Sequence, residues 1–413
     1  GCGLERITIP EGVEEIGASA FQSCGRLSEV VIPESVSSIG DNAFLDCKSL
    51  LAVNIPKNVG VIGGQAFQGC ASLTAIEVDG LNQNYASAEG ILYSKDMAAL
   101  VCCPAGKSGD AAVAAEVKKI EPYAFFGCAG LTGAALPEGV ESIGMYAFSG
   151  CSGLREIALP DTVSAAGASV FQGCGSLGKV KMSGNMPDVP SYFFSGCGSL
   201  GEIVLPENIG SIGMYAFQGC SMLPEVRLPA KVGMVDPTAW EGCGALASIV
   251  VDGENPAYDS DESGVLYKEG MAELVCCPPN HPGMGQAAFT VPEGVASLGA
   301  YAFYGCRNLE KVELAAAISE IGEYAFGNCS ALEEFTVPEE SQACFGQIGH
   351  RCYSLFRLGP PGPQRQTPRL NRRQARQRPA CGRRCQPRDH HGSPRRPDTG
   401  LLQRPRRPPL RVN

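Results

Sequence analysis

The sequence predicts a solenoid of stacked coils, each made of short β-strands joined by tight turns. Three observations predict this class. Cysteines recur with a period of about 23 residues over most of the chain, an aromatic residue precedes most of them by three positions, and the same apolar pattern surrounds each pair. Self-similarity at a fixed period of about 20–50 residues is typical of repeat architectures, in which each unit packs on its neighbours.

The cysteine series gives the period and its interruptions. Two intervals are more than twice as long as the rest, the one from Cys70 to Cys128 and the one from Cys243 to Cys306. Eleven units carry an aromatic residue three positions before the cysteine, and Trp240 is the one that is not phenylalanine. The cysteines of the series are Cys2, Cys24, Cys47, Cys70, Cys128, Cys151, Cys174, Cys197, Cys220, Cys243, Cys306 and Cys329.

The first half of each unit predicts a short strand. In residues 200–222, which follow the pattern LxxIxLPxxVxxIGxxAFxGCxx, Ile203 and Leu205 alternate onto one face. Pro206 comes next and has no backbone N–H, so it ends the strand and begins a turn. We therefore expect each coil to start with a strand whose apolar side chains point inward.

The second half of the unit predicts the return of the chain. Ile212 lies on the opposite wall, and Gly213 permits the next bend. Ala216 and Phe217 are expected in a short helical or 3-10 turn, with the ring in the interior, and Cys220 closes the coil. A single unit buries too little apolar surface to offset its loss of conformational entropy, so the coils must stack.

The run LPEGVESIGMYAFSGCSGLREIALP, residues 136–160, resembles the BspA-type leucine-rich repeats of bacterial surface proteins. The resemblance covers about residues 1–342 and implies a leucine-rich-repeat solenoid. The middle coils depart from the pattern and are expected to be less regular. Ala166, Val189 and Val235 replace the Ile of the Ile-Gly pair, and Pro190 and Asp236 replace its Gly.

The two long intervals predict β-hairpin inserts, over about residues 79–113 and 252–288. In the first, Gly90-Ile-Leu-Tyr93 is followed by Leu100-Val-Cys-Cys-Pro104, and the second repeats this arrangement. Two short apolar runs separated by polar residues indicate a hairpin. The resemblance also implies such inserts, because they often interrupt arrays of this family.

Charge divides the chain at about residue 343. The net charge of −10 combines an acidic body, residues 1–342, with a segment, residues 343–413, that has 17 Arg, no Lys and only two acidic residues. The body should not bind nucleic acid. The Arg- and Pro-rich segment is expected to be disordered. It is either a polyanion-binding tail or the product of translation in the wrong frame, because a one-base shift over residues 350–357 can spell the repeat signature IGAxAFSG.

The cysteines, glycines and acidic residues predict no catalytic, cofactor or metal site. Thiols spaced at one constant interval form a row and do not converge on one ion, so buried free thiols are expected, with a structural or redox role as the alternative. The glycine runs that imitate phosphate loops precede a strand instead of a helix. Asp259, Asp261 and Ser263 resemble the start of a calcium loop, but Gly270 stands where a bidentate Glu is needed, so a solvated acidic turn is favoured over a weak calcium site.

The remaining function is binding. A solenoid presents a long surface whose exposed residues vary over a constant core. The resemblance implies a secreted or surface-attached bacterial protein that engages host or neighbouring-cell macromolecules. Because the sequence has no nucleophile elbow, HExxH motif or Cys–His pair, no enzymatic activity is expected. A structural spacer that displays another domain is the alternative, and polyanion binding through the tail is a third. Because the array starts within a unit, a longer native protein is expected. The candidate binding residues on the strands are Arg155, Glu156, Lys179, Lys181, Glu202, Glu225 and Arg227.

Overall fold

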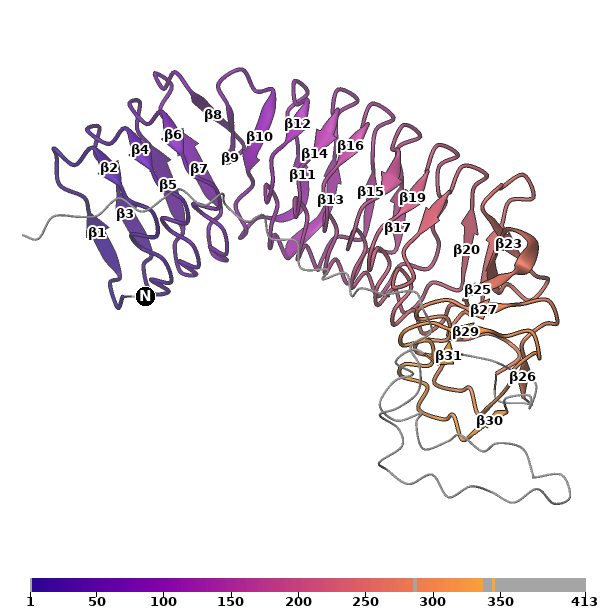
Figure 1. Cartoon of the computed structure of the whole chain (residues 1–413). Coiled ribbons are helices and arrows are strands. Elements are labelled where there is room, and N and C mark those ends of the chain that lie inside the picture. The colour runs from indigo at the N-terminus through magenta and orange to yellow at the C-terminus, as the bar shows by residue number, and fades with distance from the viewer. Residues whose placement is uncertain (1, 285–287, 337–343, 346–413) are drawn as a thin grey trace, which may run out of the picture. The chain divides into compact units, whose positions relative to one another are not determined.

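The computed structural model describes residues 2–284, 288–336 and 344–345, all of which lie in one compact unit, residues 1–360. These residues form stacked coils with two short strands in most coils (Figure 1). The predicted leucine-rich-repeat solenoid is confirmed. Residues 346–413, and with them most of the predicted tail, lie outside the described residues.

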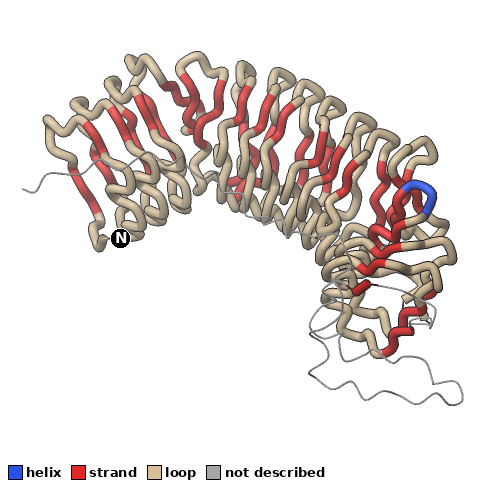
Figure 2. Tube along the Cα trace, in the orientation of Figure 1, coloured by secondary structure: helices blue, strands red, loops and turns tan. Residues whose placement is uncertain are grey.

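A first row of parallel strands carries the LxxIxL segments (Figure 2). The strands pair in parallel with equivalent strands of neighbouring coils, in sheets of two or three, as Glu156 of one coil pairs with Lys179 of the next. Within each sheet, a side chain therefore lies beside its own counterpart. The row consists of β1 (Arg6–Thr8), β3 (Glu29–Val31), β5 (Ala52–Ile55), β7 (Ala75–Val78), β11 (Ser108–Ala112), β13 (Gly130–Ala135), β15 (Glu156–Ala158), β17 (Lys179–Lys181), β20 (Glu225–Leu228), β22 (Ser248–Val251), β26 (Phe289–Thr290), β28 (Lys311–Glu313) and β30 (Glu334–Thr336).

A second row of two-residue strands carries the Ile of the Ile-Gly pair, which is buried in most coils. This row consists of β2 (Glu15–Ile16), β4 (Ser38–Ile39), β6 (Val61–Ile62), β12 (Lys119–Ile120), β14 (Ser142–Ile143), β16 (Ala165–Ala166), β18 (Asp188–Val189), β19 (Ser211–Ile212), β21 (Met234–Val235), β27 (Ser297–Leu298), β29 (Glu320–Ile321) and β31 (Cys344–Phe345).

The expected loss of regularity in the middle coils is local. The sheet that contains β14 ends at β16, where Ala166 stands in place of Ile. Val189 and Val235, in contrast, both pair with Ile212 in one three-stranded sheet.

The predicted helical or 3-10 turns around the aromatic residues are ordinary turns. Ala216 N–H donates to the Gly213 carbonyl and Cys220 N–H to the Phe217 carbonyl, both with the three-residue spacing of a 3-10 turn. Two left-handed residues, Tyr215 (φ 54°) and Gly219 (φ 71°), interrupt that run, and the Phe217 N–H donates across to Ala239 of the next coil at 2.9 Å. Among the described residues, the only helix is η1 (Glu269–Met271).

The aromatic spine, which comprises Phe21, its ten counterparts and the cysteines that follow them, fills the interior as predicted. Neighbouring rings stack with centroids 4.5 Å apart at Phe125–Phe148 and 5.7 Å apart at Phe171–Phe194. Most of the rings and thiols are fully buried. The thiols of the series from Cys47 to Cys306 remain free, as expected, but Cys2 and Cys24 form a disulfide at the first coil, with Cα atoms 4.8 Å apart.

Each insert contains one strand more than the predicted hairpin. The first has β8 (Tyr85–Ala88), β9 (Ile91–Ser94) and β10 (Ala99–Cys102), paired antiparallel in that order, and the second has β23 (Tyr258–Ser260), β24 (Leu266–Lys268) and β25 (Glu273–Cys276). The last strand of each insert then resumes parallel pairing with the second row, β10 with β12 and β25 with β27.

A buried asparagine and a tyrosine fix each insert to the coil before it. Asn82 Nδ2 donates to the carbonyls of Pro56 and Val59, and Asn255 repeats these contacts with its own preceding coil. The Tyr85 hydroxyl accepts the Ile62 N–H at 3.0 Å, and Tyr258 does the same for its counterpart. A tyrosine hydroxyl thus satisfies a backbone N–H that would otherwise remain unpaired at the end of a sheet.

Strand pairing continues past the predicted boundary at residue 343. β31 pairs in parallel with β29, so that Glu320 lies beside Cys344. Repeat-like structure therefore occurs on both sides of residue 343.

Candidate binding surfaces

The structure brings the predicted binding residues together on the first strand row. Glu156 and Lys179 are register partners on β15 and β17, and Lys181 is the register partner of Ala158. Glu202 and Glu225 occupy the same repeat position as Glu156 and Lys179 in the next two coils. Arg155 lies just before β15, and its backbone carbonyl accepts bonds from residues 178 and 179. All seven predicted side chains are exposed or half-buried.

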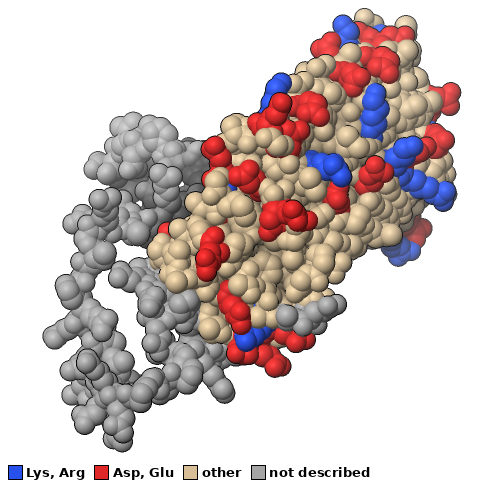
Figure 3. All heavy atoms as spheres, turned by 90° about the vertical axis from the view of Figure 1, so that its right-hand side faces the viewer, with Lys and Arg blue, Asp and Glu red and all other residues tan. Residues whose placement is uncertain are grey.

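Charges of opposite sign compensate each other on this face. Arg227 Nε lies 2.9 Å from Glu225 Oε1, and Lys181 Nζ lies 3.7 Å from Asp161 Oδ2. Figure 3 shows acidic and basic side chains interspersed on one face of the molecule. Such exposed pairs contribute little to stability, and no basic patch of the kind that binds nucleic acid is visible in this view.

A groove interrupts the strand row at residues 201–205. This segment is the first half of the unit that best fits the repeat pattern, yet it forms no strand, although Ile203 and Leu205 are buried as predicted. Elsewhere a backbone N–H at the start of the segment donates to the preceding coil, as from Gly178 to Arg155. Pro224 has no N–H with which to make that bond to residue 201.

The groove has a volume of about 520 Å³ and contains three of the predicted residues. Glu202, Glu225 and Arg227 line it together with Val204, whose exposed fraction of 71% is the highest among the large apolar residues that the structure describes. The repeat pattern assigns Val204 to an outward position but does not specify which residue type stands there. An exposed valine in a charged groove therefore could not be recognised as a candidate contact from the pattern alone.

The turns that lead from the second strand row back to the first carry a second surface, the tyrosine row. It is defined here as Tyr123, Tyr146, Tyr192, Tyr215, Tyr301 and Tyr324. All six are half-buried and occupy one repeat position, two residues before the spine aromatic. They form three stacked or tilted pairs with centroids 5.1, 5.1 and 5.5 Å apart. Met145 and Met214, each next to a row tyrosine, are also exposed.

The backbone conformation at the tyrosine-row position is one that favours residue types other than tyrosine. All six tyrosines have left-handed backbone, with φ between 53° and 63°, a conformation that costs a residue with a Cβ about 1–2 kcal/mol and that glycine and asparagine adopt more readily. The sequence reasoning missed this surface because it considered exposed residues on strands only. The recurring Tyr-Ala-Phe triplet was the signal that could have found it.

The suspected calcium loop is a hydrogen-bonded turn. Asp261 Oδ1 accepts bonds from the backbone N–H of Ser263 and Val265, and its Oδ2 accepts the Tyr267 hydroxyl at 2.9 Å. Asp259 Oδ2 accepts the Gly270 N–H instead. The carboxylates therefore satisfy donors within the insert, and within the described residues no group of three or more metal-ligating side chains converges.

His281, in a Pro- and Gly-rich loop, is buried. Its Nδ1 accepts the Gly283 N–H at 3.0 Å, and its ring contacts Phe289 edge to face. Burial lowers the pKa of this imidazole. Among the residues that the structure describes, no helix has the length and hydropathy that a bilayer crossing requires.

The parallel strands, held in one register from coil to coil, define a leucine-rich-repeat solenoid together with the stacked rings and buried thiols. A family model described as the BspA type leucine-rich repeat region matches residues 1–88, 118–247 and 285–358, in six copies. The chain belongs to this family, and the match extends beyond residue 343.

Solved structures that are similar to the chain include three bacterial leucine-rich repeat proteins. A leucine-rich cell surface protein from Faecalibacterium prausnitzii is 29% identical over 60% of this chain and 60% of its own, with a TM-score of 0.47. A leucine-rich repeat protein from Eubacterium ventriosum is 25% identical over 62% and 81%, with a TM-score of 0.50. One from Bacteroides ovatus is 22% identical over 81% and 75%, with a TM-score of 0.48. The chain thus spans less than two thirds of the first of these proteins, and no curated protein matches it.

Proposed function

We propose that the chain is a non-catalytic binding module that engages a macromolecule, most directly a protein, outside the bacterial cell. The observation that carries this proposal is the tyrosine row. Tyrosine is enriched at protein interfaces because it offers a large, rigid contact area with a polar tip. Six tyrosines at one strained position, spread along the stack, favour an extended contact surface.

The surface location is part of the proposal and rests on the family. BspA-type repeats resemble those of secreted and surface-attached bacterial proteins, and the Faecalibacterium relative is described as a cell surface protein. The absence of catalytic chemistry is likewise proposed from the family and the fold, since leucine-rich-repeat solenoids generally bind and display.

Saturable binding of the full chain to a panel of purified extracellular-matrix proteins tests the proposal. Tyr146→Ser and Tyr215→Ser, combined, remove two row tyrosines, and serine already occupies this position at Ser19 and Ser169. We expect the affinity for a bound matrix protein to fall by about tenfold or more, as for the loss of interface hot spots, with the thermal unfolding midpoint nearly unchanged.

A strand-face variant provides the control. Lys179→Ser with Lys181→Ser removes exposed charges of the first strand row, and the proposal predicts a small effect on affinity. If this variant loses binding and the tyrosine variant does not, the binding site lies on the first strand row and not on the tyrosine row. Absence of saturable binding to any protein of the panel would favour the spacer.

A further inference from the structure

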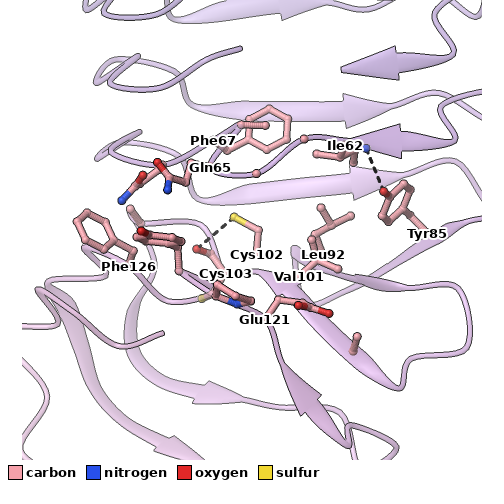
Figure 4. Close-up of a pocket in the computed structure, with 18 of the residues that line it drawn as sticks. Ile62, Gln65, Phe67, Tyr85, Leu92, Val101, Cys102, Cys103, Glu121 and Phe126 are labelled. Carbon is pink, nitrogen blue, oxygen red and sulfur yellow. Dashed lines mark hydrogen bonds between the residues drawn. The ribbon is translucent and has the colours of Figure 1, made fainter. Parts of the chain in front are cut away.

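The first insert leaves a cavity beside the aromatic spine. The cavity has a volume of about 470 Å³, within the range of about 300–1,000 Å³ that is usual for small-ligand sites. Phe67 and Phe126, from the coils on either side, line it together with Cys102 of the insert (Figure 4). It lies here because the insert replaces a coil but supplies no ring to the spine.

The second insert has the same site, almost filled. A space of only about 10 Å³ remains there, and every residue that lines it has its repeat counterpart among the residues that line the open cavity. Trp240 stands in place of Phe67, Pro279 in place of Ala105, and Tyr304 in place of Phe126. Each substitution adds bulk.

Packing and a hydrogen bond close the second site. The Trp240 ring stacks on Phe217 at 5.0 Å, while its indole N–H has no hydrogen-bond partner among the described residues, so the indole contributes shape only. The Tyr304 hydroxyl donates to Glu241 Oε1 at 3.1 Å. At the first site, Phe126 has no hydroxyl with which to make such a bond.

The open site has an aromatic wall and no unpaired charge. Phe67 stacks on Phe44 at 5.6 Å with one side of its ring and lines the cavity. Within an uninterrupted run of coils, such as that from Phe125 to Trp240, the next coil supplies another ring at about this distance. Glu121 is the only charged residue of the lining, and its Oε1 already pairs with Lys119 Nζ at 2.8 Å. An uncharged ligand therefore suits the site better than an ion.

We propose that the cavity beside Phe67 binds one uncharged aromatic ring of about the size of indole, which occupies the space that the bulkier Trp240, Pro279 and Tyr304 fill at the second insert. The ring belongs either to a small molecule or to a side chain of a bound peptide. This inference goes beyond the proposed function and does not depend on the tyrosine row.

A titration of the full chain with 5-fluoroindole, followed by fluorine NMR, tests the proposal. We expect saturable binding at one site. Phe67→Trp combined with Ala105→Pro introduces the residues of the second insert and should weaken binding by at least about tenfold. Equal binding by this variant, with unchanged circular dichroism and thermal unfolding, would overturn the proposal.

The second insert provides the reverse experiment, which also guards against misfolding of the first variant. Trp240→Phe with Pro279→Ala and Tyr304→Phe should open a second site and raise the stoichiometry from one to two. The peptide acetyl-Gly-Trp-Gly-amide distinguishes the two sources: binding of free fluoroindole alone indicates a small-molecule ligand, whereas tight binding of the peptide indicates a side chain. If neither probe binds the unmodified chain, the proposal is wrong.

Discussion

The free spine thiols from Cys47 to Cys306 combine burial with a hydrogen bond to a backbone carbonyl. Cys197 Sγ lies 3.2 Å from the Phe171 carbonyl and Cys243 Sγ lies 3.0 Å from the Phe217 carbonyl, one coil earlier in both cases. The Phe171 carbonyl also accepts the Cys174 N–H, so the thiol adds a second bond to an acceptor that is already satisfied. A small apolar residue with a weak donor suits this site better than alanine or serine.

Burial also makes these thiols a source of alkaline instability. It raises the pKa of Cys197 and of Cys243 from 9.0 to about 12. Between these values the unfolded chain has lost its thiol protons while the folded chain still holds them, so rising pH favours unfolding. We expect the free energy of unfolding to fall from about pH 9 upward, by as much as about 1.4 kcal/mol per pH unit for each such thiol.

Urea unfolding at several pH values measures this slope. In the variant Cys197→Ala with Cys243→Ala, the fall above pH 9 should be shallower than in the unmodified chain. The variant should also be less stable at pH 7, because each truncation leaves a small cavity. Identical slopes in the two proteins would contradict a thiol origin.

At the scale of elements, the two inserts are copies of one module, and glycine marks the place where each approaches the preceding coil. Gly264 has a left-handed backbone (φ 85°), and a Cβ there would lie 2.3 Å from the Ser248 Cβ. Gly270, in the same insert, is also left-handed (φ 71°) but has nothing within 4 Å of such a Cβ. The two positions separate the cost of backbone conformation from that of a steric clash.

We expect Gly264→Ala to destabilise the protein more than Gly270→Ala. The second change should cost about 1–2 kcal/mol, from the left-handed conformation alone. Gly264→Ala carries the same conformational cost, and its new methyl group must also push β22 and the insert apart. The urea unfolding midpoint of Gly264→Ala should therefore be clearly lower than that of Gly270→Ala. Equal midpoints would mean that the insert moves away from Ser248 without loss of stability.

The sequence predicted these elements unevenly. The period, the inward Phe217 and Cys220 positions and the location of the inserts follow from residue type, because ring stacking and burial leave a regular apolar pattern. The left-handed Tyr215 does not, since tyrosine gives no local signal for that conformation. Hydrogen bonds between coils on either side of it, such as that from Phe217 to Ala239, impose it.

The binding surfaces, too, were predictable from the sequence only in part. The alternation of the strand correctly placed Glu202 and Glu225 on the surface. The cavity beside Phe67 was not predictable from the pattern, because it results from a ring that the insert does not supply. Only a comparison of the two modules in three dimensions shows that Trp240 and Tyr304 fill the corresponding space.

At the scale of the whole described array, the inserts divide the core into three blocks. Buried side chains cluster from Ile9 to Leu92, from Ile91 to Cys276 and from Val265 to Phe335. Each block overlaps the next within an insert. The spine breaks at the same places, since Phe67 and Trp240 are the last rings stacked in their series before an insert.

Adjacent residues of β24 belong to different blocks. Leu266 packs in the middle block, whereas Tyr267 packs in the third. The first insert repeats this division at Leu92 and Tyr93. Because the energetics of a solenoid depend on contacts between neighbouring coils, each insert strand acts as a partition between two regions that can open separately.

We therefore expect two neighbouring substitutions to destabilise different regions. Leu266→Ala should speed amide exchange in the coils before the second insert, from about residue 120 to 250, by the equivalent of about 2–5 kcal/mol. Tyr267→Ala should speed amide exchange in residues 289–336 by a similar free-energy equivalent. In this variant, the amides of the middle coils should remain protected. Native-state hydrogen exchange read by mass spectrometry resolves the two regions. If both variants accelerate exchange equally in all three blocks, the array opens as one cooperative unit and the insert strands are not partitions.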